Sequence, residues 1–141
     1  MPALIELTVD ECERLLRRGT FGRVVLSTPR GNEILPVNYT VHESVVVIHT
    51  SPDGILARYA HGAELLFEVD LVDEERWNGW SVVARGRGRI SLDFRAVPPV
   101  HPWAAGDRSC ELQLSWEELS GRRVGAAWDL ERAMYSRKPV G

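Results

Sequence analysis

Short segments that alternate between apolar and polar residues, each closed by a turn signal, constrain the fold of this chain most. The pattern predicts strands over residues 23–28, 33–41 and 44–50, joined by turns at 29–32 and 42–43. About seven strands at such regular spacing are typical of a small antiparallel barrel. The other predicted strands cover residues 64–70, 80–91, 110–116 and 119–124, with a loop over 72–79.

A helix is predicted before the first of these strands. Thr8 and Glu11 have the spacing of a capping box, Leu15 and Leu16 belong to an apolar stripe, and Gly19 ends the pattern. The stripe indicates that this N-terminal helix covers part of the core.

A second, shorter helix is predicted over residues 55–61. Ser51 is its expected N-cap, Pro52 is expected in its first turn, and Gly62 closes it. Another short helix is possible over residues 129–134. The predicted fold is therefore mainly β, an antiparallel barrel with an N-terminal helix and short covering helices.

Size and charge limit the class of protein. The 141 residues predict one domain over 1–141, with a core over about 7–124 and a tail over 125–141. A formal net charge of −3 disfavours nucleic acid as a partner, because such binders carry a basic face. The longest apolar run, from Val45 to Ile48, is far too short to cross a membrane. We therefore expect a soluble protein.

Reactive side chains are sparse and scattered. Cys12 and Cys110 are far apart in the sequence, which is typical of buried thiols in a reduced, cytoplasmic protein. No known catalytic motif occurs, so the sequence assigns no catalytic residue. The histidines are also too dispersed to predict a metal site, since they stand at His42, His49, His61 and His101.

The strand predicted over residues 80–91 has two different faces. A stripe of arginines that includes Arg85 and Arg87 shares one face, while the other face is apolar or glycine. Two interpretations follow. The arginines pair with carboxylates such as Glu68 and Asp70 on the neighbouring strand, or they bind an anion, for which guanidinium groups are well suited.

Six short motifs occur in an order that is specific in combination. They are P-V-N-Y at 36–39, H-T-S-P at 49–52, F-E-V-D at 67–70, G-W-S-V at 79–82 before R-G-R, P-W-A at 102–104 and G-R-R at 121–123. Over roughly residues 7–124 the chain thereby resembles the pyridoxamine 5′-phosphate oxidase-like family of flavin-binding split barrels. The resemblance implies an antiparallel split β-barrel, the FMN-binding split barrel, that forms a homodimer with flavins in clefts between the subunits.

The same resemblance implies which residues contact the cofactor. They are Pro36, Val37, Asn38 and Tyr39 at the isoalloxazine, Thr50 and Ser51 at the phosphate, Ser81 beside the ring, and Trp103 from the partner subunit.

The chain departs from this family at Ile55, where relatives commonly carry a lysine that neutralises the cofactor phosphate. An apolar side chain cannot replace that charge, and Asp53 adds charge of the wrong sign. Affinity for a phosphorylated flavin is therefore expected to fall unless Arg58, Arg85 or Arg87 compensates.

The function that the resemblance implies is an FMN-dependent oxidoreductase, which transfers a hydride between a nicotinamide or small substrate and the flavin. A deazaflavin is an alternative cofactor, because its longer acidic tail would suit the arginine stripe. A third interpretation is a dimer of the same fold that lacks a cofactor, since Ile55 replaces the expected lysine, and that acts as a binding or structural protein.

Overall fold

The computed structural model describes residues 4–91 and 109–125 of the chain. Strands dominate these residues, as predicted. In chain order the elements are β1 (Leu4–Glu6), α1 (Val9–Arg18), β2 (Phe21–Thr28), β3 (Gly31–Asn38), β4 (Thr40–His42), β5 (Val45–Thr50), α2 (Ile55–Tyr59), β6 (Glu64–Asp73), β7 (Asn78–Ser91) and β8 (Cys110–Val124).

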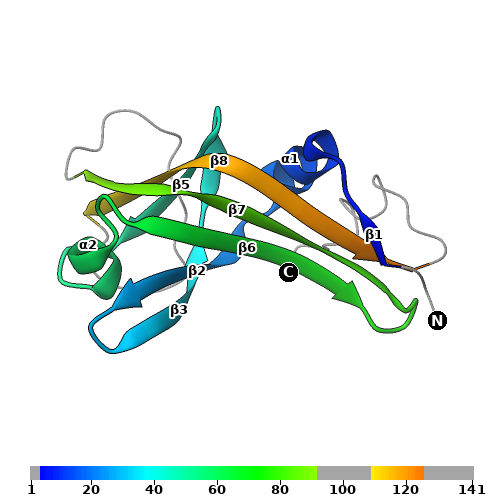
Figure 1. The fold of residues 1–141 in the computed structure, drawn as a ribbon, viewed down its shortest axis with the longest axis horizontal. Helices are drawn as coiled ribbons and strands as arrows, with labels where there is room; N and C mark the ends of the chain where they lie inside the picture. Colours follow the sequence, from blue (N-terminus) through cyan, green and yellow to red (C-terminus); the bar gives the residue numbers. More distant parts are fainter. Residues whose placement is uncertain (1–3, 92–108, 126–141) are drawn as a thin grey trace.

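The described strands form one antiparallel sheet. Its order is β3-β2-β6-β7-β8-β5-β4, and β1 pairs with β8 outside this path. Figure 1 shows the sheet curving along its long strands β6, β7 and β8. β3 and β5 contact each other without pairing, so the sheet curls towards closure but stays open. The predicted antiparallel split barrel with an N-terminal helix and a short covering helix is confirmed.

The core lies on one face of this curled sheet. Val24, Phe67 and Leu112 are fully buried there, and α1 adds Leu15 and Leu16. Because successive side chains of a strand point to opposite faces, the remaining strand residues form a second surface. We call this surface the outer face.

The start of α1 has the predicted capping box. The Thr8 hydroxyl accepts a hydrogen bond from the Glu11 N–H at 3.1 Å, and the Thr8 N–H donates to the Glu11 carboxylate at 3.0 Å. Gly19 ends the helix, as predicted. The two reciprocal hydrogen bonds satisfy backbone donors that a helix start otherwise leaves unpaired.

The loop predicted over residues 72–79 is wrong. β6 continues to Asp73 and β7 begins at Asn78, so a tight hairpin replaces most of it. The Asp73 carboxylate accepts a hydrogen bond from the Arg76 N–H at 3.1 Å, and Trp77 has a left-handed backbone with a φ of 53°. Acidic residues hid this hairpin, because they break the apolar alternation on which a strand prediction depends.

The strands predicted over residues 110–116 and 119–124 form the single strand β8. The register shifts opposite Arg85 and Gly86, where Glu117 is the extra residue of a β-bulge. Because a bulge adds one residue to the strand, the inward-pointing residues shift by one position in the sequence beyond it. The alternation of apolar and polar residues before the bulge is therefore out of phase with the alternation after it. This change of phase resembles a strand end.

Gly86 allows β7 and β8 to approach at the bulge. A Cβ atom at Gly86 would lie 2.0 Å from the Ser115 carbonyl oxygen. Gly88 has a similar role two residues later, since a Cβ atom there would lie 2.4 Å from the Ala60 carbonyl oxygen. Both positions therefore require a residue without a side chain.

The strand predicted over residues 33–41 is interrupted at Tyr39, between β3 and β4. The Tyr39 N–H donates to the Thr20 carbonyl at 3.0 Å, and its hydroxyl donates to the Leu16 carbonyl at 2.6 Å. The residue leaves the strand ladder because its side chain packs in the core beneath α1.

The predicted N-cap of α2 is wrong, although the helix does begin at Ile55 as predicted. Gly54, not Ser51, is the N-cap, and the helix runs from Ile55 to Tyr59. The Ser51 hydroxyl accepts a hydrogen bond from the Asp53 N–H at 3.3 Å, and the Ser51 carbonyl accepts one from Gly54 at 3.1 Å. Ser51 therefore closes a turn that precedes the helix.

The sequence did not predict β1, because Leu4–Glu6 do not alternate between apolar and polar residues. All three residues are exposed in the structure. The predicted contact residue Trp103 and the helix predicted over 129–134 lie outside the described residues. Within residues 4–91 and 109–125, no helix has the length and hydropathy needed to span a bilayer.

Candidate functional site

Several of the predicted site residues lie on the outer face, in rows of paired residues that run across neighbouring strands. Pro36 and Ser81 belong to neighbouring rows and are separated by β2 and β6. Since paired strands lie about 4.8 Å apart, these two residues are roughly 15 Å from each other. The first row consists of Pro36, Arg23, Glu68 and Val83, and the second of Asp70, Ser81 and Arg122.

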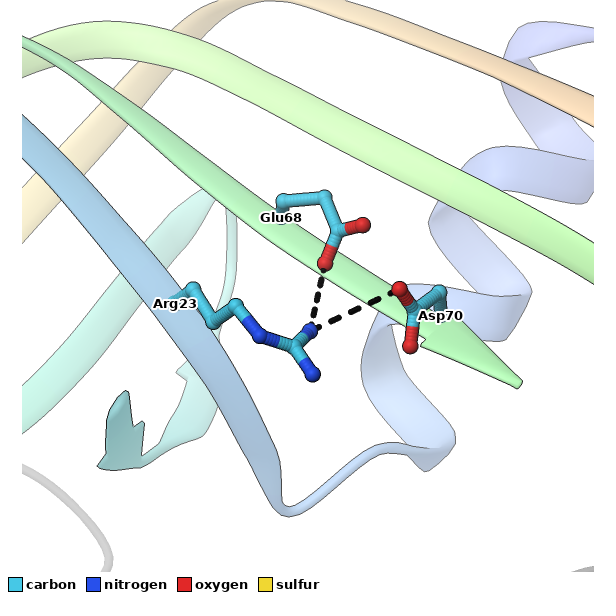
Figure 2. A network of polar contacts seen from close by, with 3 residues as sticks. All are labelled: Arg23, Glu68 and Asp70. Carbon is cyan, nitrogen blue, oxygen red and sulfur yellow. Dashed lines mark hydrogen bonds and ion pairs between the residues drawn. The ribbon is translucent and has the colours of Figure 1, made fainter. Parts of the chain in front are cut away.

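Between Pro36 and Ser81 lies a cluster of three charged side chains, shown in Figure 2. The Arg23 guanidinium donates to the Glu68 carboxylate at 2.9 Å and lies 3.5 Å from the Asp70 carboxylate. The three side chains are partly buried, with exposed fractions of 42% for Arg23, 29% for Glu68 and 37% for Asp70. One cation thus faces two carboxylates that share one side of β6.

The two carboxyl groups do not ionise independently. Partial burial, a hydrogen bond to Asp70 and the negative charge of Asp70 raise the pKa of Glu68 from 4.5 to about 7, although Arg23 opposes this rise. Glu68 therefore keeps its proton to a higher pH than an exposed glutamate does. The cluster can therefore hold or release a proton near neutral pH.

The predicted ring contacts on β3 differ in accessibility. Pro36 is exposed on the outer face, whereas Val37 packs against the core. The Asn38 side-chain amide donates to the Thr20 carbonyl at 3.4 Å. Tyr39 is only 3% exposed, so its side chain supports the core and does not form a surface that a ligand could reach.

The predicted phosphate contacts lie around the turn before α2. Thr50 is buried at the end of β5, and the Ser51 hydroxyl is occupied by the Asp53 N–H. Ile55 is 37% exposed at the first position of α2, and Arg58 is exposed one turn later. A lysine at position 55 would therefore reach solvent beside this turn.

Two arginines of the stripe have partners, Arg85 with carboxylates other than those predicted and Arg87 with a backbone carbonyl. Arg85 lies 3.0 Å from Glu64 and 3.9 Å from Glu118, and Arg87 donates to the Gly62 carbonyl at 3.0 Å. The predicted pairing with Glu68 and Asp70 is wrong, because Arg23 on the opposite neighbour of β6 binds those two carboxylates. The sequence pattern could not show which neighbouring strand would supply the cation.

The predicted cofactor contacts fall into two separate groups. Ser81 lies near one end of β7, while Gly88 lies near the other and donates its N–H to Ala63, a few residues after α2. At about 3.3 Å per residue, the part of β7 between Ser81 and Gly88 spans roughly 23 Å. The structure therefore does not bring Ser81 together with Thr50, Ser51 and Arg58 within one chain.

Beyond Ser81 the outer face ends in a pocket of about 740 Å³ beside the β6–β7 hairpin. We call it the hairpin pocket. Its walls come from β1, the hairpin and the end of β8, and they include Leu4, Asp70, Val72, Trp77, Ser81 and Arg122. Asp70 thus belongs both to the charged cluster and to this pocket.

A second polar cluster lies on β5 and β8. Glu111 is only 1% exposed, and its carboxylate lies 3.3 Å from the His49 ring and accepts a hydrogen bond from the Gln113 amide at 2.6 Å. His49 directly precedes Thr50, and Glu111 directly follows the residue that pairs with Thr50. The cluster therefore fixes the strand ends that carry the predicted phosphate contacts.

Sequence reasoning missed Arg23 and the hairpin pocket. The F-E-V-D motif does show that Glu68 and Asp70 share one face, because they are two residues apart in a strand. Their closeness to Arg23 depends on the pairing of β2 with β6, which lie more than forty residues apart in sequence. No local pattern carries that information.

Comparison with known proteins identifies relatives over most of the chain. The family model described as pyridoxamine 5′-phosphate oxidase matches residues 8–123. An uncharacterized protein of Mycobacterium tuberculosis is 30% identical over 132 residues, which cover 87% of each chain.

Two solved structures are also similar. The FAD binding protein from Mycobacterium smegmatis has a TM-score of 0.68 and 27% identity, over 86% of this chain and 98% of its own. The putative pyridoxamine 5′-phosphate oxidase from Corynebacterium glutamicum has a TM-score of 0.71 and 24% identity, over 88% of this chain and 100% of its own. The second likeness concerns the fold alone.

Proposed function

Because the chain belongs to the pyridoxamine 5′-phosphate oxidase family, we propose that it is a flavin-binding oxidoreductase of the split-barrel type. The observation that carries the proposal is the outer face, where Pro36 and Ser81 stand on either side of the Arg23 cluster. This strand face has a proline on one side, a hydroxyl on the other and charged groups between them. A flavin bound there would supply hydride transfer.

The residues of this chain would orient the flavin and set its surroundings. Pro36 and Ser81 would contact the ring, and Ser81 can donate or accept a hydrogen bond there. Thr50, Ser51 and Arg58 would hold the phosphate. The Glu68 carboxyl can hold a proton near the same face.

The proposed flavin is FMN or FAD. The Mycobacterium smegmatis relative is named for FAD, which supports a site that tolerates the larger cofactor. Ile55 stands where relatives carry a lysine near the phosphate. In this chain, contacts to the flavin ring would therefore supply a larger share of the binding free energy than they do in relatives with the lysine.

The absorbance spectrum of the purified protein tests this function. A band near about 450 nm supports FMN or FAD, and the cofactor released by denaturation identifies which of them is bound. A band at about 400–420 nm would instead indicate that the bound cofactor is a deazaflavin. A colourless protein that takes up neither cofactor would contradict the proposal and favour a binding or structural role.

We also propose that the chain forms a homodimer with the flavin between the subunits. The wide separation of Ser81 from the turn before α2 supports this, because a second subunit could complete each site. Sedimentation at micromolar concentration is expected to give twice the 15.9 kDa mass of one chain. A monomer mass throughout that range would contradict both the dimer and the shared sites.

Replacing Ile55 by lysine is expected to tighten FMN binding by about tenfold. The new ammonium group would form a charge-assisted hydrogen bond to the phosphate, and one such bond corresponds to about 1.5 kcal/mol or more. Ile55 is already 37% exposed, so the substitution should cost little stability. Fluorescence titration of the wild type and Ile55→Lys with FMN measures the change.

Riboflavin is the matched control for this variant, because it lacks the phosphate. Its affinity is expected to stay the same, and the gain with FMN is expected to shrink at high salt. Equal FMN affinity in both proteins would mean that position 55 does not face the phosphate.

A further inference from the structure

The hairpin pocket contains an apolar row with a gap in it. The row consists of paired residues from four strands, Val72, Gly79, Val124 and Leu4. Val72 is 68% exposed and Leu4 is 63% exposed, so these side chains are open to a ligand. Gly79 has no side chain, which leaves a hollow between its two neighbours in the row. The pocket volume of about 740 Å³ lies within the usual range for ligand sites.

Trp77 gives the pocket a preference for flat molecules. It lies in the turn of the β6–β7 hairpin, lines the pocket and is 80% exposed. Aromatic pairs gain attraction beyond the apolar area that they bury. An open indole beside an apolar surface therefore favours a planar aromatic ring over a saturated one.

Arg122 supplies an available cation. It pairs with Ser81 across β7 and β8, so both side chains lie on the outer face, in the row next to the apolar one. The Arg122 side chain is exposed, and within residues 4–91 and 109–125 no hydrogen bond or ion pair engages its guanidinium. A guanidinium group matches the two oxygens of a carboxylate with two parallel hydrogen bonds.

Two of the three carboxylates that line the pocket are paired with arginines. Asp70 lies 3.5 Å from the Arg23 guanidinium, which it shares with Glu68. Asp73 accepts a hydrogen bond from the Arg76 N–H at 3.1 Å and lies 3.8 Å from the Arg76 side chain. Opposite charges this close offset much of the repulsion that a bound anion would meet.

The remaining charges leave Arg122 available to an anion. Glu74 lines the pocket but is exposed, so water and salt screen its repulsion. Glu6 lies opposite Arg122 on β1, and in the described part of the chain the two form no ion pair. Because an exposed ion pair contributes little, a ligand can compete with Glu6. Arg123 also lines the pocket and adds a second positive charge.

We propose that the hairpin pocket binds a planar aromatic carboxylate, whose ring packs against Trp77 and the apolar row while its carboxylate accepts hydrogen bonds from Arg122. Binding concerns only residues of this chain. A role of this ligand as the substrate rests on the proposed function, because a flavin ring at Ser81 would be adjacent to it.

Three bicyclic compounds test the ligand class by titration calorimetry. The probe is 2-naphthoate. Its amide, 2-naphthamide, keeps the ring without the charge, and decahydro-2-naphthoate keeps the charge without the planar ring. We expect 2-naphthoate to bind about tenfold more tightly than the amide, with a smaller ratio at high salt. It should bind about threefold more tightly than the saturated acid. Equal affinity for 2-naphthoate and its amide would overturn the proposal.

Arg122→Gln is expected to weaken 2-naphthoate binding by about tenfold and to leave 2-naphthamide unaffected. Arg89→Gln is the matched control, because it removes the same charge from an exposed side chain on the same face of β7. Arg89 is eight residues from Ser81, which corresponds to roughly 26 Å along the strand. Its variant should bind 2-naphthoate as the wild type does. An equal loss in both variants would mean that net charge, not a contact, attracts the anion, and the proposal would be wrong.

Trp77→Ala is expected to remove the preference for 2-naphthoate over the saturated acid, since that preference comes from the indole. An unchanged preference would contradict the role of Trp77. If 2-naphthoate does not bind and Trp77→Ala halves the mass found by sedimentation, the pocket is a contact between subunits and the proposal is wrong.

Titration with and without saturating FMN separates this site from the cofactor site. The affinity for 2-naphthoate is expected to be the same in both. If FMN displaces 2-naphthoate competitively, the pocket is part of the cofactor site and the proposal is wrong. If 2-naphthoate binds as expected to a protein that takes up no flavin, the pocket stands and the oxidoreductase function fails. If flavin is taken up and 2-naphthoate is not, only the pocket proposal fails.

Discussion

Replacing Gly86 by alanine is expected to destabilise the protein by at least about 3 kcal/mol. The new Cβ atom would lie 2.0 Å from the Ser115 carbonyl oxygen, which is far inside van der Waals contact. The atom that must move belongs to the backbone of β8, so the bulge itself would have to change. Overpacking against rigid backbone is among the few mechanisms that give effects of this size.

Urea unfolding of the wild type and Gly86→Ala measures this loss, with Arg87→Ala as the control. Arg87 is the next residue of β7, but its side chain is exposed and makes one hydrogen bond to Gly62. Its removal should cost about 1 kcal/mol or less. If the two variants were equally stable, β7 and β8 would not be packed as closely as described.

Stability is also expected to fall as pH rises from about 4.5 to above 7. Partial burial and Asp70 raise the pKa of Glu68 from 4.5 to about 7, so the folded protein binds more protons than the unfolded chain in this window. The stabilising contribution of protonated Glu68 is therefore complete below the unfolded pKa and lost above the folded one. The shift corresponds to a change on the order of 2 kcal/mol, since solvent screening at this partly exposed group reduces its full effect.

Glu68→Gln isolates this contribution. The variant should lose most of the decrease between pH 5 and pH 8, because glutamine does not titrate and leaves Asp70 paired with Arg23 alone. Chemical denaturation at several pH values gives the free energy of unfolding of both proteins. The same pH dependence in wild type and variant would show that Glu68 ionises normally in the folded state.

Alternation of residues predicted most of the strands, because one face of each strand packs in the core. The prediction failed where another interaction replaced that pattern. In the β6–β7 hairpin, Asp73 and Trp77 form a tight turn within an acidic sequence. At Glu117, a bulge changes the phase of alternation without ending the strand.

The prediction of Ser51 as the N-cap of α2 failed for a different reason. Ser51 followed by Pro52 has the composition of a helix start, but the same residue types also form turns. The hydrogen bonds to Ser51 close such a turn, and the helix begins only after Gly54. Local sequence does not distinguish these two uses of serine.

The candidate site was predictable in part. The motifs named Pro36 and Ser81, and strand alternation placed Ser81 and Arg85 on one face. The partner of Glu68 was not predictable, since it depends on the order of strands in the sheet. The hairpin pocket was hidden for the same reason, because Leu4 and Arg122 meet the hairpin only through the pairing of β1 and β7 with β8.

The position of Pro36 bears on how two copies of this chain could associate. Within the described residues β3 is the last strand at one end of the sheet, and an unpaired strand edge can recruit a strand from another molecule. Proline has no N–H to offer in the middle of that edge, so a continuous intermolecular ladder along β3 would be broken. Two copies are therefore expected to associate through side chains of their outer faces. The same proline that would contact a flavin is thus also expected to oppose aggregation by strand addition.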